Sequence, residues 1–274
     1  MKKNIKTHFN IHSQRLLVIL SFFGLLYSFY ITFFTNNFYY FVMPFLLGKF
    51  IVGLFATQMA LHRYFSHKSF STDNLRHKFL CLISLFAGQG SPVAWAAHHR
   101  HHHIHADTEF DTHSPKESKF FASGFWIFRS YDFYLIEKKL RKVPTDLLRD
   151  SFIKFIDSNY YYIWAILIFT IGCLNYKFLL LYILAPVAWG IINSAFITLL
   201  SHIKLPGSYR NYNTLDDSYN NKFIQIYMLG EAHNNHHYNP SNYIEAVKKG
   251  EFDLVGYLIN KLFVVSEPNR KYIV

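Results

Sequence analysis

Long apolar blocks separated by polar segments dominate the pattern of this chain. Four of them approach or reach the roughly 20 mostly apolar residues that a helix needs to span a bilayer. They cover residues 16–34, 38–61, 160–174 and 178–200. Short polar links join the blocks within each pair, which predicts two helical hairpins. The pattern therefore predicts an all-α integral membrane protein with four transmembrane helices, built as a single domain over residues 1–274.

A fifth apolar block covers residues 79–97. Its length would allow it to span, but Gly88, Gly90 and Pro92 fall in its second half. Glycine and proline interrupt a regular helix. The apolar pattern alone therefore leaves the placement of this block open.

Lys and Arg residues are distributed unevenly around the four blocks. The N-terminal segment is basic and holds no acidic residue, and the two short links hold only Lys177. The N-terminal basic residues are Lys2, Lys3, Lys6 and Arg15. Because basic loops stay on the cytoplasmic side, both termini and the segments 98–158 and 202–274 are predicted to be cytoplasmic.

Composition agrees with a membrane protein. Hydrophobic residues make up 51% of the chain and charged residues 16%, against about 25% charged in soluble domains. The formal net charge of +11 fits a basic surface beside anionic lipid. Nucleic-acid binding is the other usual interpretation, but the charge flanks apolar blocks and no nucleic-acid motif appears. Two cysteines, Cys81 and Cys173, exclude a disulfide scaffold and a Cys-rich metal site.

Most of the 16 histidines gather in three motifs beside the apolar blocks. The motifs are HRYFSH at 62–67, HRHHH at 99–103 and HNNHH at 233–237, and a lone His202 follows the fourth block. Residues three and four apart share a helix face, so the second and third motifs are each predicted to present their imidazoles to one point. Neutral imidazole suits zinc, copper, iron and nickel. One such run is also typical of an adventitious metal-binding tract, whereas three favour a built site for two ions.

These motifs, in this order around four apolar blocks, resemble the histidine boxes of membrane fatty acid desaturases of the acyl-CoA type. The resemblance implies a two-iron centre on a cytoplasmic helical cap, with O2 as co-substrate. The implied iron ligands are His62, His67, His99, His102, His103, His202, His233, His236 and His237. Since all boxes must then face one side, the block 79–97 is expected to lie at the membrane interface without crossing it.

Other residues are expected beside these ligands. Thr198 stands where the family has an asparagine that reaches one iron through water, and a hydroxyl also holds a water. Glu231 belongs to a Gly-Glu segment that the family places near its third box. Asp107 opens an acidic run that either orients ligand imidazoles or forms a solvated loop; its other members are Glu109 and Asp111.

A fainter resemblance concerns the substrate. Gln89, Trp95 and Ser194 match, or are similar to, residues that line the bend of the family's acyl tunnel. Ordinary packing in an apolar segment is the alternative. A bent tunnel implies a cis double bond, and the resemblance points to carbon nine of palmitoyl or stearoyl chains.

The resemblance also implies partners. No cytochrome b5-like extension is visible after the third motif, so a separate electron donor of the ferredoxin, flavodoxin or cytochrome b5 type is expected, together with a fatty acyl substrate and the lipid bilayer. A bacterial inner membrane is the expected location.

Two other functions compete with a desaturase. One is a di-iron hydroxylase or ketolase, which would retain an oxygen atom in its product. The other is a metal transporter, which would need polar residues inside its spans. Lys49 is the only formal charge within the four apolar blocks, so the transporter is the weaker hypothesis.

Overall fold

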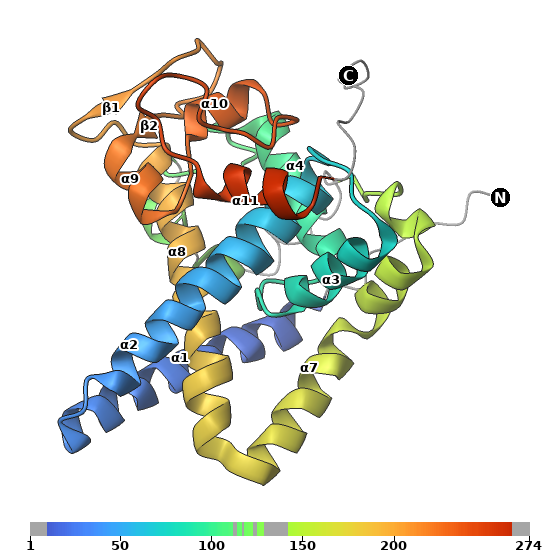
Figure 1. The fold of residues 1–274 in the computed structure, drawn as a ribbon, viewed down its shortest axis with the longest axis vertical. Helices are drawn as coiled ribbons and strands as arrows, with labels where there is room; N and C mark the ends of the chain where they lie inside the picture. Colours follow the sequence, from blue (N-terminus) through green and yellow to red (C-terminus); the bar gives the residue numbers. More distant parts are fainter. Residues whose placement is uncertain (1–9, 112–113, 117, 123–124, 129–141, 265–274) are drawn as a thin grey trace.

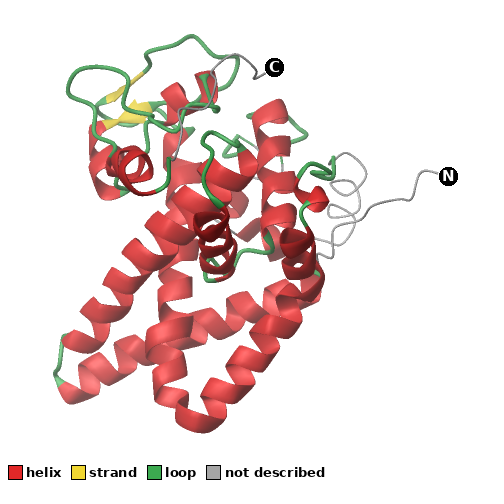
Figure 2. Ribbon diagram, turned by 45° about the vertical axis from the view of Figure 1, so that its right-hand side comes forward, coloured by secondary structure: helices red, strands yellow, loops and turns green. Residues whose placement is uncertain are grey.

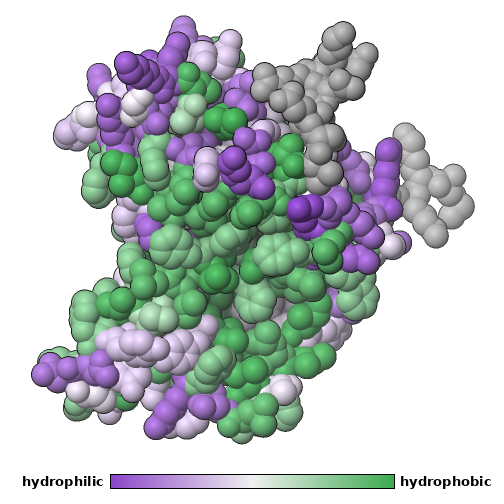
Figure 3. Space-filling view, in the orientation of Figure 1, coloured by the Kyte–Doolittle hydropathy of each residue, from purple (hydrophilic) through white to green (hydrophobic). Residues whose placement is uncertain are grey.

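The computed structural model describes residues 10–111, 114–116, 118–122, 125–128 and 142–264. The two termini, which the sequence predicts to be cytoplasmic, lie outside these residues. Helices form most of the described chain (Figure 2). In the view of Figure 3, hydrophilic residues gather at the end of the molecule that carries β1 (Ser208–Tyr209), β2 (Asn220–Asn221) and α10 (His233–Tyr238), and the long helices away from this end bear mainly hydrophobic residues.

Among the described residues, three helices are long and apolar enough to cross a membrane: Ile11–Thr35, Tyr39–Ser66 and Ser151–Ser201. The first is α1. The second joins α2 (Tyr39–Leu47) to the π-helix η1 (Gly48–Ser66). The third joins α7 (Ser151–Phe178), η4 (Leu179–Leu184) and α8 (Ala185–Ser201).

The third of these helices turns back on itself at Asn175. This residue has φ −159° and ψ 90°, far from helical values, inside α7. Its side-chain oxygen accepts a hydrogen bond from the backbone N–H of Phe178 at 3.0 Å, which caps the helix that follows. In Figure 1, α7 and α8 accordingly form two arms that meet near this turn.

Two long helices begin well before the apolar blocks that predicted them. Asn10 caps α1 by accepting from the N–H groups of His12 and Ser13, so this helix begins at Ile11. Asp150 caps α7 in the same way, and that helix begins at Ser151. Side-chain caps satisfy N–H groups that a helix start leaves without partners. Polar first turns are therefore stable here, although a hydropathy pattern does not include them.

The block 79–97 is divided between two helices. α3 (Asn74–Leu85) ends before the glycines, and α4 (Pro92–His105) begins at the proline. Gly88 and Gly90 have φ values of +67° and +101°, which glycine adopts without strain. A Cβ on Gly88 would also lie 2.3 Å from Cγ1 of Val187. The close approach and the positive φ together require glycine at this break.

Helix α7 fixes the point where α4 begins. The Ser91 hydroxyl caps α4 through the N–H of Ala94 and also bonds the buried carboxylate of Asp157 on α7. The hydroxyl of Tyr160, one helical turn further on, accepts from Gly90 N–H at 3.2 Å. These bonds set the direction in which α4 leaves the break, and α4 carries the second histidine motif.

The helices approach one another closely. A Cβ added to Gly190 on α8 would lie 2.1 Å from Cγ1 of Val52 on η1, and small residues allow such contacts between membrane helices. Beneath the histidine motifs, the buried core joins η1, α3, α4, α7 and α11 (Leu254–Leu262). Residues from each of these helices are Phe65, Leu80, Val93, Ile156 and Ile259.

Short elements complete the end of the molecule beyond η1 and α8. They are β1 (Ser208–Tyr209), β2 (Asn220–Asn221), α9 (Lys222–Tyr227) and α10 (His233–Tyr238), and, elsewhere, α5 (Lys119–Ala122), η2 (Phe125–Phe128) and η3 (Leu147–Arg149). The strands pair antiparallel, with Ser208 opposite Asn221 and Tyr209 opposite Asn220. The all-α prediction did not include this pair, because two-residue strands leave no alternating pattern to detect.

Candidate metal centre

The nine histidines that the sequence singles out lie together in two groups. Within each group, one ring nitrogen of every member lies within 4.8 Å of the others. We call them the five-histidine group and the four-histidine group. The five-histidine group consists of His62, His67, His99, His103 and His236. The four-histidine group consists of His102, His202, His233 and His237.

A π-helix brings the first motif into the five-histidine group. In η1 the hydrogen bonds run from residue i to residue i+5, and His67 N–H donates to the carbonyl of His62 at 3.2 Å. Residues five apart therefore lie one above the other, as His62 and His67 do. In an α-helix residues three and four apart share a face, so α-helical spacing could not predict this pair.

Helices α4 and α10 each supply both groups, which corrects the prediction that each motif points to one place. On α4, His99 and His103 enter the five-histidine group and His102 enters the other. On α10, His233 and His237 enter the four-histidine group, and the third histidine of that motif enters the five-histidine group. In each motif, the two histidines four residues apart belong to the same group, and the remaining ligand histidine belongs to the other group. Each helix therefore lies between the two groups.

The Nε2 atoms approach one another closely in both groups. In the five-histidine group, each Nε2 atom lies 2.8–3.1 Å from the Nε2 atom of a neighbouring ring. The pairs are His62 with His236, His236 with His103, His103 with His99, and His99 with His67. In the four-histidine group, the Nε2 atoms of His202 and His233 are 2.9 Å apart. Nitrogen lone pairs this close repel one another unless a proton or a cation lies between them. Adjacent ligands on an ion with bonds of about 2.1 Å, as in zinc–imidazole sites, have a similar spacing.

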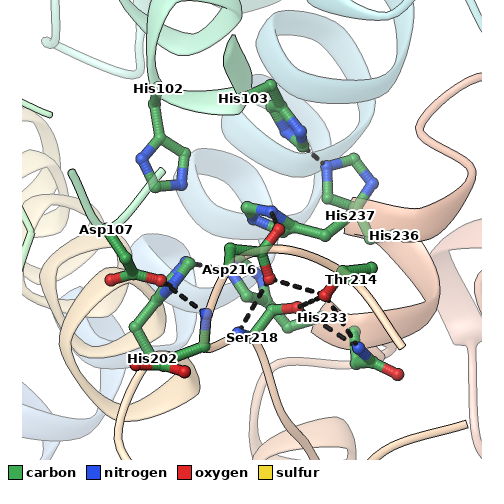
Figure 4. A network of polar contacts seen from close by, with 12 residues as sticks. His102, His103, Asp107, His202, Thr214, Asp216, Ser218, His233, His236 and His237 are labelled. Atoms are coloured by element: carbon green, nitrogen blue, oxygen red, sulfur yellow. Dashed lines mark hydrogen bonds and ion pairs between the residues drawn. The ribbon is translucent and has the colours of Figure 1, made fainter. Parts of the chain in front are cut away.

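Each imidazole of the four-histidine group turns its Nδ1 toward a carboxylate. The pairs are His102 with Asp111 at 3.0 Å, His202 with Asp107 at 2.8 Å, His233 with Glu231 at 2.7 Å and His237 with Asp216 at 3.0 Å. Figure 4 shows Asp107 beside His202, and Asp216 held by Thr214 and Ser218. A carboxylate on Nδ1 fixes the ring orientation and leaves Nε2 free to bind a metal.

The five-histidine group has less acidic support. His62 Nδ1 faces the amide oxygen of Gln58 at 3.0 Å. His236 Nδ1 lies 3.4 Å from Oε1 of Glu245, without hydrogen-bond geometry. In the described part of the chain, no carboxylate lies within ion-pair distance of the other three members, His67, His99 and His103.

Burial favours the neutral form of most of these imidazoles. Burial lowers the pKa of His99, His103 and His237 well below the usual value, and neighbouring imidazoles add to the effect. Burial also lowers the pKa of His67, to about 3. His102 differs: burial acts to lower its pKa, but the Asp111 carboxylate outweighs this and raises it. Neutral imidazoles are the form that binds transition metals.

The donor set fits two metal ions. Nε2 of His237 is buried within the four-histidine group and has no hydrogen-bond partner among the described residues. An orphaned buried nitrogen is costly unless something binds it. Imidazole ligands without thiolates suit iron, zinc, copper or nickel, and the two groups together offer nine nitrogens. The residues present therefore match a two-iron centre of the kind that the resemblance implies.

The structure places all three residues expected beside the ligands close to the four-histidine group. Asp107 and Glu231 bond His202 and His233 directly, which favours the orienting role of Asp107 over a solvated loop. Thr198 lines a cavity next to His233 and donates its hydroxyl proton to the carbonyl of Ser194. Its oxygen lone pairs remain available to a water.

The three predicted tunnel residues also contact one another. Gln89 Nε2 donates to the hydroxyl of Ser194 at 3.0 Å, and Trp95 Nε1 donates to Gln89 Oε1 at 3.4 Å. Trp95 and Ser194 line a cavity that also reaches His62 and His233. Gln89 lies behind this wall and holds its two partners in place.

Two histidines in or just after the second motif, His101 and His105, lie outside both groups. His101 is buried and bonds the carbonyl of Phe110 at 2.9 Å, and its ring packs beside that of His105. Glu109, which follows them, is exposed. Neither His101 nor His105 contributes a nitrogen to the two groups.

Two arginines, Arg63 buried and Arg100 half-buried, position the motifs and were not predicted. Arg63 ties η1 to the segment after α9, through Gly230 O at 2.9 Å, Asp253 at 3.0 Å and Glu245 at 3.1 Å. Arg100 bonds the carbonyls of two residues at the end of η1, at 2.7 Å and 2.9 Å, and so holds α4 against it. Each arginine directly follows the first histidine of its motif, which is a signal that the sequence contains. Gln58 and Asp216 carry no comparable signal.

Comparison with known proteins gives consistent matches. The sequence model described as "Fatty acid desaturase" matches residues 40–245. The acyl-CoA C20 Delta5-desaturase of Anemone leveillei is 32% identical over 222 residues, which cover 77% of this chain and 67% of that protein. Delta-9 acyl-lipid desaturase 1 of Arabidopsis thaliana is 30% identical over 227 residues, 78% of this chain and 70% of that one. The sn-2 palmitoyl-lipid 9-desaturase of Nostoc sp. (strain 36) is 27% identical over 195 residues, 69% and 67% of the two chains. The chain spans about two thirds of the length of these relatives.

Proposed function

This chain belongs to the fatty acid desaturase family, and from that premise we propose that it forms a cis double bond at carbon nine of palmitoyl or stearoyl chains. That it is a membrane-bound fatty acyl desaturase follows from the family and from its long apolar helices. The finer assignment is ours. The observation that carries it is the convergence of nine imidazoles beside a cavity walled by Trp95 and Ser194.

We assign the two histidine groups as the ligands of two iron ions. Bound iron would supply the activation of O2 that the reaction needs, because no side-chain acid or base removes hydrogen from an unactivated methylene. The chain's own residues do the rest. Carboxylates such as Asp107 and Asp216 hold imidazoles in orientation, and burial keeps the rings neutral and ready to bind metal.

The cavity is the proposed site of the acyl chain. Its wall includes His62, His99 and His102, so a chain in it would lie against both histidine groups. Trp95 stacks on the ring of His99 with centroids 4.7 Å apart, which holds the indole against one of the proposed metal ligands. Rigid placement is required, since a shift of about 1 Å in such a reaction can cost about a hundredfold in rate.

The proposed arrangement in the membrane has four spans, with α7 and α8 crossing separately on either side of Asn175. Both termini and the histidine groups would then lie on the cytoplasmic side, where a ferredoxin, flavodoxin or cytochrome b5-type donor would deliver electrons. External labelling of single cysteines tests this topology. Positions 36 and 176 should react, and positions near 110 and 240 should not; reaction at 110 would contradict it.

The function is tested by expression in a host that lacks its own desaturase, with mass spectrometry of derivatised fatty acids. We expect carbon-nine cis products from palmitoyl or stearoyl chains. Trp95→Ala should scatter the bond position or lower turnover without releasing iron. A product unsaturated at carbon five, as the name of the Anemone leveillei relative would suggest, would refute carbon nine and keep the desaturase. A product that retains oxygen would instead indicate a hydroxylase.

A further inference from the structure

The side chain of Gln58 connects the two histidine groups. Gln58 lies on η1 four residues before His62 and is buried, with 6% of its surface exposed. Its Oε1 lies 3.0 Å from His62 Nδ1, and its Nε2 donates to Oε2 of Glu231 at 2.8 Å. The other oxygen of Glu231 lies 2.7 Å from His233 Nδ1. An unbroken chain of polar contacts therefore runs from the five-histidine group to the four-histidine group.

Glu231 sets the polarity of this chain of contacts. Both oxygens of Glu231 face nitrogen atoms: Oε2 accepts from Gln58 Nε2, and Oε1 lies beside His233 Nδ1. An ionised carboxylate only accepts hydrogen bonds, so Gln58 must turn its NH2 to Glu231 and its carbonyl to His62. That carbonyl also only accepts. Nδ1 of His62 therefore carries the proton, and Nε2 presents its lone pair to the five-histidine group.

An amide suits this position better than a carboxylate. A second carboxylate in place of Gln58 would face Glu231 at about 2.8 Å, where like charges repel strongly in a buried site. An apolar side chain would leave His62 Nδ1 and Oε2 of Glu231 without the partners that Gln58 provides. Glutamine both accepts and donates, so one negative charge on Glu231 orients two imidazoles.

We propose that Gln58 is a positioning residue of the metal centre, which together with Glu231 fixes the tautomers of His62 and His233 and so couples metal binding at the two groups. This inference rests on the proposed function, because it requires that both groups hold metal. Loss of either bridging residue is then felt in both groups, although each residue bonds only one histidine.

Two single variants and their combination test the bridge. Gln58→Glu places two carboxylates face to face. Glu231→Gln places the NH2 group of the new glutamine against the NH2 group of Gln58. If the Gln58 amide flips to avoid this, its NH2 group faces His62 Nδ1, which must then give up its proton. The double variant exchanges the amide and the carboxylate. The glutamate at 58 then accepts from His62, and the glutamine at 231 donates to that glutamate and accepts from His233. Purified full-length chains would be titrated anaerobically with ferrous iron against a competing chelator, and ⁵⁷Fe Mössbauer spectra recorded.

Each single variant should weaken iron binding by about 10–100-fold, the usual cost of losing an outer partner of a metal ligand, and should change the spectrum of both irons. The double variant should recover most of the affinity. Contacting residues show such non-additive effects, whereas independent residues give additive ones. Additive losses in the double variant, or single variants with wild-type affinities, would overturn the bridge and leave the proposed function intact. A wild-type chain that binds no iron would overturn both.

Gln14 offers a matched control. It is a buried glutamine, 2% exposed, whose Nε2 donates to the Gly88 carbonyl and whose Oε1 accepts from Tyr161. Neither of these two partners belongs to a histidine group. Gln14→Leu should lower the thermal midpoint of unfolding and leave both iron affinities and the Mössbauer spectrum unchanged. An iron loss equal to that of Gln58→Glu would contradict a specific role for Gln58.

Discussion

In the four-histidine group every imidazole turns Nδ1 to a carboxylate. Within the described ranges, the five-histidine group has one amide, from Gln58, and one carboxylate, Glu245, at 3.4 Å. The second and third motifs supply both groups, so the difference lies in what surrounds the imidazoles. The carboxylates come from polar segments: Asp107 and Asp111 after α4, Asp216 between β1 and β2, and Glu231 before α10.

The five-histidine group lies instead between η1 and α4, which both carry a buried or half-buried arginine. The charges of Arg100 and Arg63 add to burial in lowering the pKa of His67. One group is thus surrounded by negative charge and the other has positive charge nearby. Because carboxylates behind imidazoles strengthen metal binding, we expect the four-histidine group to hold its ion more firmly.

The largest expected effect is the loss of a ligand from either group. His67→Ala removes a nitrogen from the five-histidine group and His202→Ala removes one from the other. Both should reduce desaturation by more than about a hundredfold, the upper range for losing only an outer partner. His101→Ala, a buried histidine of the same motif region outside both groups, should remain active. Retained activity in either ligand variant would show that one group is dispensable.

A smaller effect is expected from the acidic support itself. Asp216→Asn keeps an acceptor near His237 Nδ1 but removes the charge. We expect about 10–100-fold weaker iron binding, confined mainly to the four-histidine group, in a chelator competition. Asp146→Asn is the control, since Asp146 pairs with Arg100 and Lys68 and with no imidazole of the groups. Equal iron affinities in Asp216→Asn and wild type would break the comparison between the groups.

The smallest expected effect concerns the metal-free protein and pH. Burial lowers the pKa of His67 to about 3 and those of His99 and His103 well below the usual value. The unfolded chain takes up these protons near pH 6.5 and the folded chain does not. The contribution of these histidines to the unfolding free energy is therefore fully present above about pH 6.5. It falls as the pH drops toward their pKa values in the folded chain.

His102 opposes this trend. The Asp111 carboxylate outweighs burial and raises its pKa, so its contribution is present at low pH and is lost as the pH rises through that value. Histidines with a lowered pKa outnumber His102, whose pKa is raised. The thermal midpoint of unfolding of the metal-free chain should therefore fall by several degrees between about pH 7 and about pH 5. The thermal midpoint of the iron-loaded chain should fall less over this range, as long as the pH stays above the value at which the chain releases metal. A constant midpoint in the metal-free chain would contradict neutral buried imidazoles.

Local patterns allowed much of the fold and the site to be predicted. Apolar length indicated the long helices, and Gly88 and Gly90 indicated the break before α4. The resemblance of the histidine motifs to the desaturase boxes named all nine members of the two groups. These signals lie within short stretches of sequence, where helical periodicity relates residues directly.

What could not be predicted depends on contacts between distant segments. The π-helix that aligns His62 with His67 has no spacing signature of its own. The division of α4 and α10 between two groups requires knowing that each helix lies between them. The bridge from Gln58 to Glu231 joins residues far apart in the chain, and a single buried glutamine resembles any other until its partners are known.

Metal analysis after anaerobic iron loading tests the central claim most directly, because the two groups either hold one iron each or do not. The account predicts about two irons in the wild-type chain and about one in His202→Ala, with the iron of the five-histidine group retained, and O2-dependent desaturation by the two-iron form only. A single zinc ion per chain, with no iron-dependent activity, would contradict it.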